Sequence, residues 1–133
     1  MRTRSGDKGD ARQRLDLGDA YLDLADLANT ASSRAARQAA VGNYVLAAIA
    51  YADVICLAAL GRRSAETDHT RAAQLLATTD PSAADSLRKL LSYKTQAHYG
   101  TATMSPDDLK RAQRLTQTLR RAANMAVASS RSS

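Results

Sequence analysis

Apolar residues recur along most of this chain at intervals of three and four positions, the spacing that places them on one face of an α-helix. Between these stretches lie short polar segments, including residues 61–67. The sequence therefore predicts one domain of helices over residues 11–128, with flexible tails at 1–10 (a basic tail) and 129–133. The individual helices are predicted over about 10–29, 33–60, 69–79, 81–100 and 106–128.

Residues that favour helix ends mark several of these boundaries. Gly61 follows the second apolar run and is typical of a left-handed C-cap, while Asp68 precedes the third helix as an N-cap. The pairs Asp80-Pro81 and Ser105-Pro106 each combine an N-cap with proline at the first helical position. In the first helix, the residues expected to face the core are Leu17, Ala20, Tyr21, Leu24, Leu27 and Ala28.

The composition favours helices over strands. Aromatic residues make up 4% of the chain, and 6 glycines and 2 prolines supply few turns for a many-stranded fold. We therefore expect an all-α protein, a five-helix antiparallel up-and-down bundle. The apolar run over 44–60 contains Asp53 and is expected to be the buried helix of a soluble protein rather than a membrane span. The single Cys56 suits a reducing cytoplasm.

The charge and the motifs limit the chemistry. A net charge of +6 favours anionic partners such as RNA or nucleotides, although it also fits simple solubility. Two histidines and one cysteine, without metal-ligand spacing, predict neither a metal site nor a cofactor. The basic residues of the last helix are expected to be a solvated face.

Asp53 and the stretch from Lys94 to Tyr99 form one group of candidate binding residues. Asp53 lies among apolar neighbours, where a carboxylate needs a partner: it is either a satisfied core residue or part of a polar cleft. Lys94 and His98 continue the inner stripe of the fourth helix, which would then open onto a groove. The alternative is that Lys94 only extends its ammonium into water and His98 and Tyr99 finish the helix.

A second group of candidates surrounds the segment after residue 60. Arg62 and Arg63 precede His69, and this combination suits phosphate binding by arginine and proton transfer by histidine. The alternative is that the arginines satisfy the last carbonyls of the preceding helix while His69 opens the next one. Packing of the second helix against the fourth is expected to bring Asp53, Lys94 and Tyr99 to one shared cleft.

The stretches YADVICLAALGRR and LLSYKTQAHYG, with the A-x-x-A-x-x-L spacing of the last helix, resemble HEPN domains over about residues 12–127. The likeness is greatest to short stand-alone actinobacterial members of this family of nucleotide-binding and RNA-cleaving bundles. The resemblance implies a homodimer. HEPN ribonucleases carry an Arg and a His on one helix, and here Lys94 and Tyr99 stand at those positions. Tyr99 does not transfer protons near neutral pH as histidine does.

Three functions are consistent with these features. The first is a nucleotide- or RNA-binding module of a toxin–antitoxin or defence system, with Asp53, Arg62, Lys94 and Tyr99 as ligand-binding residues and a cognate partner such as a nucleotidyltransferase. The second is an active metal-independent endoribonuclease, in which His69 or His98 transfers protons and Arg63 or Lys94 stabilises the transition-state charge. The third is a non-catalytic protein-interaction bundle.

Overall fold

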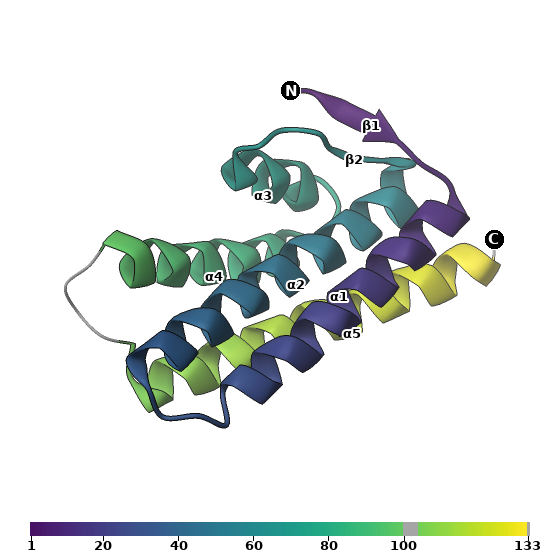
Figure 1. Cartoon of the computed structure of the whole chain (residues 1–133). Helices are drawn as coiled ribbons and strands as arrows, with labels where there is room; N and C mark the ends of the chain where they lie inside the picture. The colour runs from purple at the N-terminus through teal and green to yellow at the C-terminus, as the bar shows by residue number, and fades with distance from the viewer. Residues whose placement is uncertain (100–103, 133) are drawn as a thin grey trace.

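A computed structural model describes residues 1–99 and 104–132, with the side chains of residues 96–99, 131 and 132 outside the description. Across the described residues the chain forms five helices and one small antiparallel sheet of two strands (Figure 1). The prediction of an all-α fold is therefore confirmed apart from this sheet. The elements in chain order are β1 (Thr3–Ser5), α1 (Lys8–Ala28), α2 (Arg34–Leu60), β2 (Arg62–Ser64), α3 (His69–Ala77), α4 (Pro81–Tyr99) and α5 (Pro106–Ser132).

The predicted capping residues lie at the helix ends. Gly61 ends α2 with φ 70°, in the left-handed region that favours glycine. Asp68 accepts a hydrogen bond from the Thr70 backbone N–H at the start of α3, and Asp80 accepts one from Ala83 at the start of α4. Ser105 caps α5 in the same way. These four boundaries were predictable because each cap supplies an acceptor or a backbone conformation that the helix end requires.

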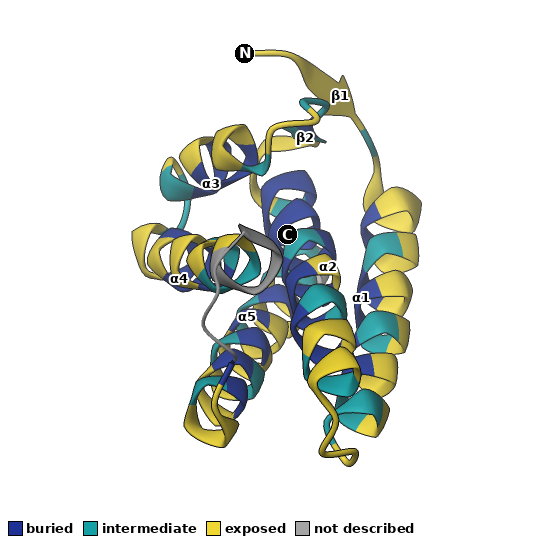
Figure 2. Cartoon of the chain, turned by 60° about the vertical axis from the view of Figure 1, so that its left-hand side comes forward, coloured by how far each residue is buried: buried dark blue, intermediate teal, exposed yellow. Residues whose placement is uncertain are grey.

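Helix α2 lies at the centre of the molecule, with α1 on one side and α3 and α4 on the other (Figure 2). Its residues between Ala40 and Leu57 are mostly buried, which removes a long apolar surface from water. By length and mean hydropathy, 1.8 over its most apolar window, α2 is apolar enough to cross a membrane. The other helices nevertheless bury 67% of that window, as expected for the core helix of a soluble protein.

A polar clasp joins α1, α2 and α5. One carboxylate oxygen of Asp19 accepts hydrogen bonds from the Tyr51 hydroxyl at 2.6 Å and from Nε of Arg120 at 2.9 Å. Tyr51 is fully buried in α2, so its hydroxyl needs this partner. Burial and the Asp19 carboxylate raise the pKa of Tyr51 well above 10.0. The tyrosine therefore stays neutral and donates its proton to the clasp.

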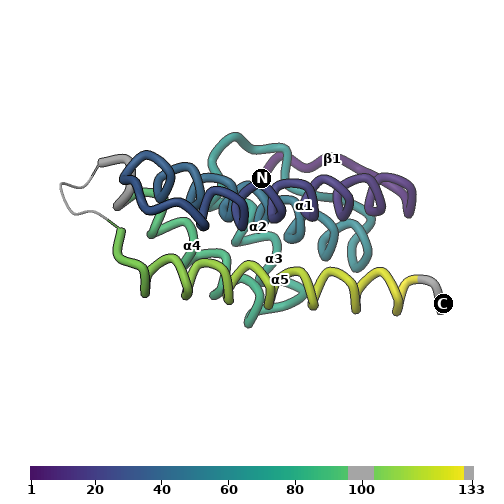
Figure 3. Tube along the Cα trace, turned by 60° about the horizontal axis from the view of Figure 1, so that its bottom comes forward, coloured from purple at the N-terminus to yellow at the C-terminus, as the bar shows by residue number. Residues whose placement is uncertain are grey.

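A second clasp lies two turns further along α1. Asp26 accepts hydrogen bonds from the Tyr44 hydroxyl at 2.7 Å and from Nε2 of Gln113 at 2.9 Å. The later residue of α1, Asp26, thus contacts earlier residues of α2 and α5 than Asp19 does. Helix α1 is therefore antiparallel to both α2 and α5, and these two helices run in the same direction. Figure 3 shows α5 extending along the length of α1 and α2.

The predicted alternation of five helices is wrong at α3. A strict up-and-down arrangement of five helices would make the first and the last parallel, but the clasps show that α1 and α5 are antiparallel. The physical reason is the path of residues 61–68, which lead from the end of α2 back to the start of α3 (Figure 1). The start of α3 lies beside Leu91 and Lys94 in the later part of α4, and the end of α3 leads directly into the start of α4, so α3 is antiparallel to α4. The four longer helices alternate in direction (Figure 1).

The predicted core face of α1 is wrong in part: Tyr21 and Ala28 pack against the core, but the leucines do not. Leu17, Leu24 and Leu27 are 39%, 52% and 68% exposed, although their spacing suggested burial. The face that packs on α2 contains small residues, because the Tyr51 ring lies against the backbone at Gly18. The close approach of α1 and α2 at Gly18 therefore determines which face of α1 is buried, and it leaves the three leucines exposed. The buried residues of α1 are Ala11, Leu15, Gly18, Leu22 and Ala25.

The first ten residues form ordered elements where a flexible basic tail was expected. β1 pairs with β2, and α1 begins at Lys8 behind a capping box formed by Asp7 and Asp10. β1 was missed because its residues are polar and exposed and carry no apolar alternation. At the other end, α5 continues to Ser132, past the predicted boundary at residue 128.

Candidate functional site

Asp53 is a buried carboxylate on the side of α2 that faces α1 and β2. It is 5% exposed, and its carboxylate lies 3.7 Å from Nη1 of Arg14. Burial raises the pKa of Asp53 to about 6, while the positive charges of Arg14 and Arg63 act in the opposite direction. The same burial raises the pKa of neighbouring Cys56 to about 12, so the thiol is not ionised near neutral pH.

Arg63 lines a polar cavity of about 200 Å³ between the small sheet and α1. Arg4 and Arg63 are direct partners in the register of the sheet, and Arg14 enters from α1. Burial lowers the pKa of Arg63, and the charges of Arg14 and Arg4 add to that effect. Sequence reasoning identified Arg63 but missed Arg4 and Arg14, because no signal indicated that β1 would pair with residues 62–64.

A second depression, of about 290 Å³, lies between the start of α3 and the later part of α4. It brings together His69 and Lys94, two of the predicted site residues. His69 is half-buried, and its pKa is lowered below 6.5 by burial and by the charge of Lys94. The imidazole is therefore neutral at pH 7 and can accept a proton. The depression is lined by Thr67, Asp68, His69, Thr70, Leu91, Lys94 and Thr95.

The predicted residues are thus divided between two places. Asp53 is paired with Arg14, whereas Lys94 faces His69, so the contacts do not support the single cleft expected for Asp53, Lys94 and Tyr99. The two helices do pack on each other, and apolar residues of both, including Leu87 and Leu90 of α4, lie in one hydrophobic core. Tyr99 ends α4, and its side chain lies outside the described residues.

The remaining predicted residues differ in what the structure says of them. His98 lies in the last turn of α4, and its side chain is likewise outside the described residues. Arg62 is exposed on β2, and it lines neither the polar cavity between the small sheet and α1 nor the depression at His69. Of the basic residues on α5, Arg111 lies 3.9 Å from Asp108 and Arg120 pairs with Asp19, so part of that predicted solvated face supports the fold.

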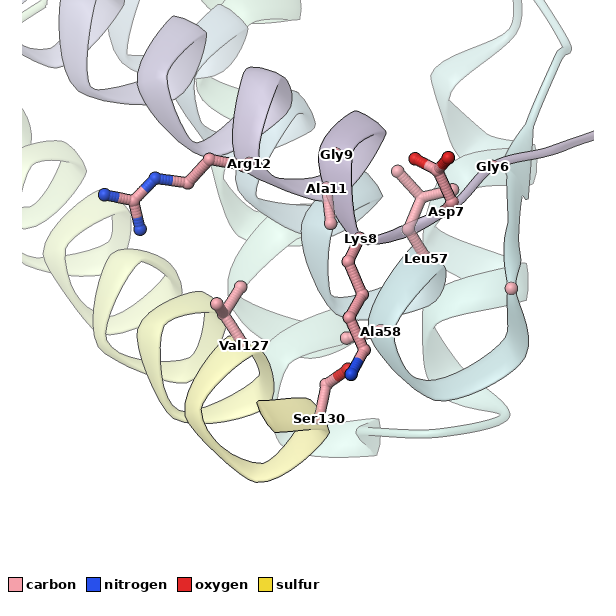
Figure 4. A pocket seen from close by; sticks show the side chains of 11 residues that line it. Gly6, Asp7, Lys8, Gly9, Ala11, Arg12, Leu57, Ala58, Val127 and Ser130 are labelled. Carbon is pink, nitrogen blue, oxygen red and sulfur yellow. The ribbon is translucent and has the colours of Figure 1, made fainter. Parts of the chain in front are cut away.

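A larger cavity, of about 710 Å³, lies where the start of α1 meets the ends of α2 and α5 (Figure 4). Its wall is formed mostly by small and apolar groups such as Ala11, Leu57 and Val127. Lys8 extends across it toward Ser130 (Figure 4). None of the predicted site residues lines this cavity, and the sequence offered no signal for it because its wall is assembled from the ends of three helices.

Among the described residues, no group of three or more histidine, cysteine or acidic side chains is placed to hold a metal ion. Comparison with protein-family models, with curated proteins and with solved structures gives no match. Any functional conclusion therefore depends on the geometry of the two polar sites and on the sequence motifs within them.

Proposed function

We propose that this chain is a HEPN-like nucleotide- or RNA-binding helical module of the cytoplasm, and that its binding site is the depression between α3 and α4. The observation that carries the proposal is the meeting of His69 with Lys94. These residues come from different helices, and the second belongs to the LLSYKTQAHYG stretch on which the HEPN resemblance depends.

The lining of the depression suits one phosphate with its attached sugar. Lys94 makes no ion pair with any described residue, so its ammonium is free to bind a phosphate oxygen. The side chains of Thr67 and Thr70 offer hydroxyls to the same space, the Thr95 hydroxyl donates to the Leu91 carbonyl, and the Leu91 side chain provides an apolar wall. Neutral His69 can hydrogen-bond a ribose hydroxyl.

Binding can be measured by fluorescence anisotropy of a labelled single-stranded RNA in EDTA. Lys94→Ala removes one phosphate contact, so it is expected to weaken binding about tenfold and to reduce the slope of log Kd against log salt by about 0.7. Lys89→Ala is the matched control, because Lys89 is an exposed lysine of the same helix that does not line the depression. Equal losses in the two variants would show that only the overall charge matters.

One observation favours a second candidate, a metal-independent endoribonuclease. The lowered pKa of His69 leaves its imidazole able to take the proton of a ribose 2′-hydroxyl, and Lys94 lies where it can stabilise charge on the attacked phosphate. Cleavage of the same RNA in EDTA, abolished by His69→Ala, would establish this activity. Saturable binding of the RNA without any cleavage would exclude the endoribonuclease and support the binding module.

The proposal includes a homodimer and a cognate partner such as a nucleotidyltransferase, in a toxin–antitoxin or defence system. An exposed apolar stripe on α1, formed by Leu17, Leu24 and Leu27, supports association with a second chain. The partner itself rests on the HEPN resemblance. If the protein neither binds nor cleaves RNA but is isolated with a partner protein, the protein-interaction bundle becomes the better description.

A further inference from the structure

Three arginine side chains from three separate elements converge on the cavity of about 200 Å³ beside the small sheet. Arg4 comes from β1, Arg14 from α1 and Arg63 from β2. The cavity is far larger than the roughly 30 Å³ share of one water molecule. The other polar side chains of its wall are those of Ser5, Asp10 and Gln13. The cavity thus combines positive charge with several hydrogen-bond donors.

The arrangement of Arg4 and Arg63 is unfavourable without an additional anion. They are directly opposed in the antiparallel register, and both line the same cavity. Like charges directly opposite each other destabilise a strand pair. β1 has three residues, and a two-stranded sheet of this size is marginal by itself. An anion bound between the two guanidinium groups would replace this repulsion with two attractive contacts, which would hold β1 in place.

The nearby carboxylates neutralise only part of this charge. Asp53 pairs with Arg14 at 3.7 Å, and no described residue forms an ion pair with Arg4 or Arg63. Asp53 does not line the cavity; the carboxylate that does, Asp10, accepts a hydrogen bond from the backbone N–H of Asp7 at the start of α1. Three guanidinium groups therefore face two carboxylates, one of which serves the helix cap.

We propose that this cavity is a binding site for a phosphate dianion, either inorganic phosphate or the phosphoryl group of a phosphomonoester. A guanidinium group presents a planar fork of donors that matches the spacing of phosphate oxygens. The ammonium of lysine has no such fork. The amide of Gln13 supplies a further donor. The site is separate from the depression at His69 and Lys94, and it does not depend on the function proposed for that depression.

Thermal unfolding of the full chain tests the site, with inorganic phosphate titrated at constant ionic strength against chloride. Binding to the folded chain alone raises Tm in a saturable manner. Arg4→Gln is the main variant, because it leaves Arg14 and Arg63 beside Asp53. In the absence of phosphate it is expected to be as stable as the wild type or more stable, since the cross-strand repulsion is gone. Its phosphate affinity is expected to fall about tenfold or more.

Arg62→Gln is the matched control, because Arg62 neighbours Arg63 on the same strand but does not line the cavity. It should retain the phosphate response, and so should Lys94→Ala. Glycerol 3-phosphate compared with glycerol separates the two sources: a larger response than inorganic phosphate gives indicates an organic phosphomonoester, and an equal response indicates free phosphate. The proposal is overturned if chloride matches the wild-type response, or if Arg4→Gln responds as the wild type does.

Discussion

The buried carboxylate of Asp53 makes stability depend on pH in an unusual direction. Most acidic groups in folded proteins have lowered pKa values and stabilise the fold as pH rises. Here burial raises the pKa from 3.8 to about 6. At about 1.4 kcal/mol for each tenfold change in proton affinity, the group contributes about 3 kcal/mol more stability when protonated.

The sign follows from proton binding in the two states. Between about pH 4 and pH 6 the folded chain holds a proton on Asp53 and the unfolded chain does not, so this contribution is present at about pH 4 and is lost as pH rises through about 6. Asp53→Asn cannot titrate, and the other groups of the chain largely cancel in the comparison. In the variant Arg14 loses its ion pair and Arg63 loses a nearby negative charge, which shifts the whole difference but not its main pH dependence.

Urea unfolding of the wild type and of Asp53→Asn, from about pH 4 to about pH 7.5, measures this effect. The free energy of unfolding of the wild type, relative to the variant, is expected to fall by about 2.4 kcal/mol over this range, because the unfolded chain is itself partly protonated at pH 4. A difference that stays constant would refute the reasoning. A difference that increases with pH would show that Arg14 and Arg63 outweigh the burial of the carboxylate.

Two further predictions test the packing and the exposed face of α1. Gly18→Ala should destabilise the fold by about 1–3 kcal/mol, because its Cβ would lie 2.6 Å from the Tyr51 ring. Gly42→Ala is the control: its Cβ meets nothing within 4 Å, so it should stabilise α2 by about 0.5–1 kcal/mol. Urea unfolding compares the two variants, and a loss of stability in both would contradict the packing. Light scattering should give the wild type twice the chain mass of 14.2 kDa. Leu24→Lys, on the exposed stripe of α1, should have the mass of one chain, whereas the control Met125→Lys on α5 should still be dimeric. A monomeric wild type would rule the dimer out.

The helices and their ends were predictable because their signals are local. Gly61, Asp68 and the two pairs that contain proline act within one turn of the backbone, so no knowledge of the tertiary structure is needed. The burial of Ala84, Leu87 and Leu90 on α4 likewise follows from their spacing.

The register between helices was not predictable in the same way. The two clasps lie seven residues apart on each of three helices. Each clasp depends on which helix faces meet, and polar residues on a helix normally indicate a face that is exposed to solvent. The face of α1 was misassigned for a related reason. Tyr51 packs on Gly18, and a glycine carries no apolar signal in the sequence.

The candidate site was predicted in part. Lys94 and His69 were each identified from their chemistry, but their meeting depends on the position of α3 against α4. Asp53 was expected to need a partner, and it has one, although the partner is Arg14 of α1. Arg4 was assigned to a tail, because the pairing of β1 with β2 joins residues about sixty positions apart.

The central claim is that the depression shared by His69 and Lys94 binds RNA or nucleotides. The most direct measurement is an NMR titration of the His69 imidazole signals with single-stranded RNA in EDTA. We expect a saturable shift of these signals, weakened by Lys94→Ala and unchanged by Lys89→Ala. Signals of His69 that do not move at saturating RNA, while the RNA is bound elsewhere or not at all, would contradict it.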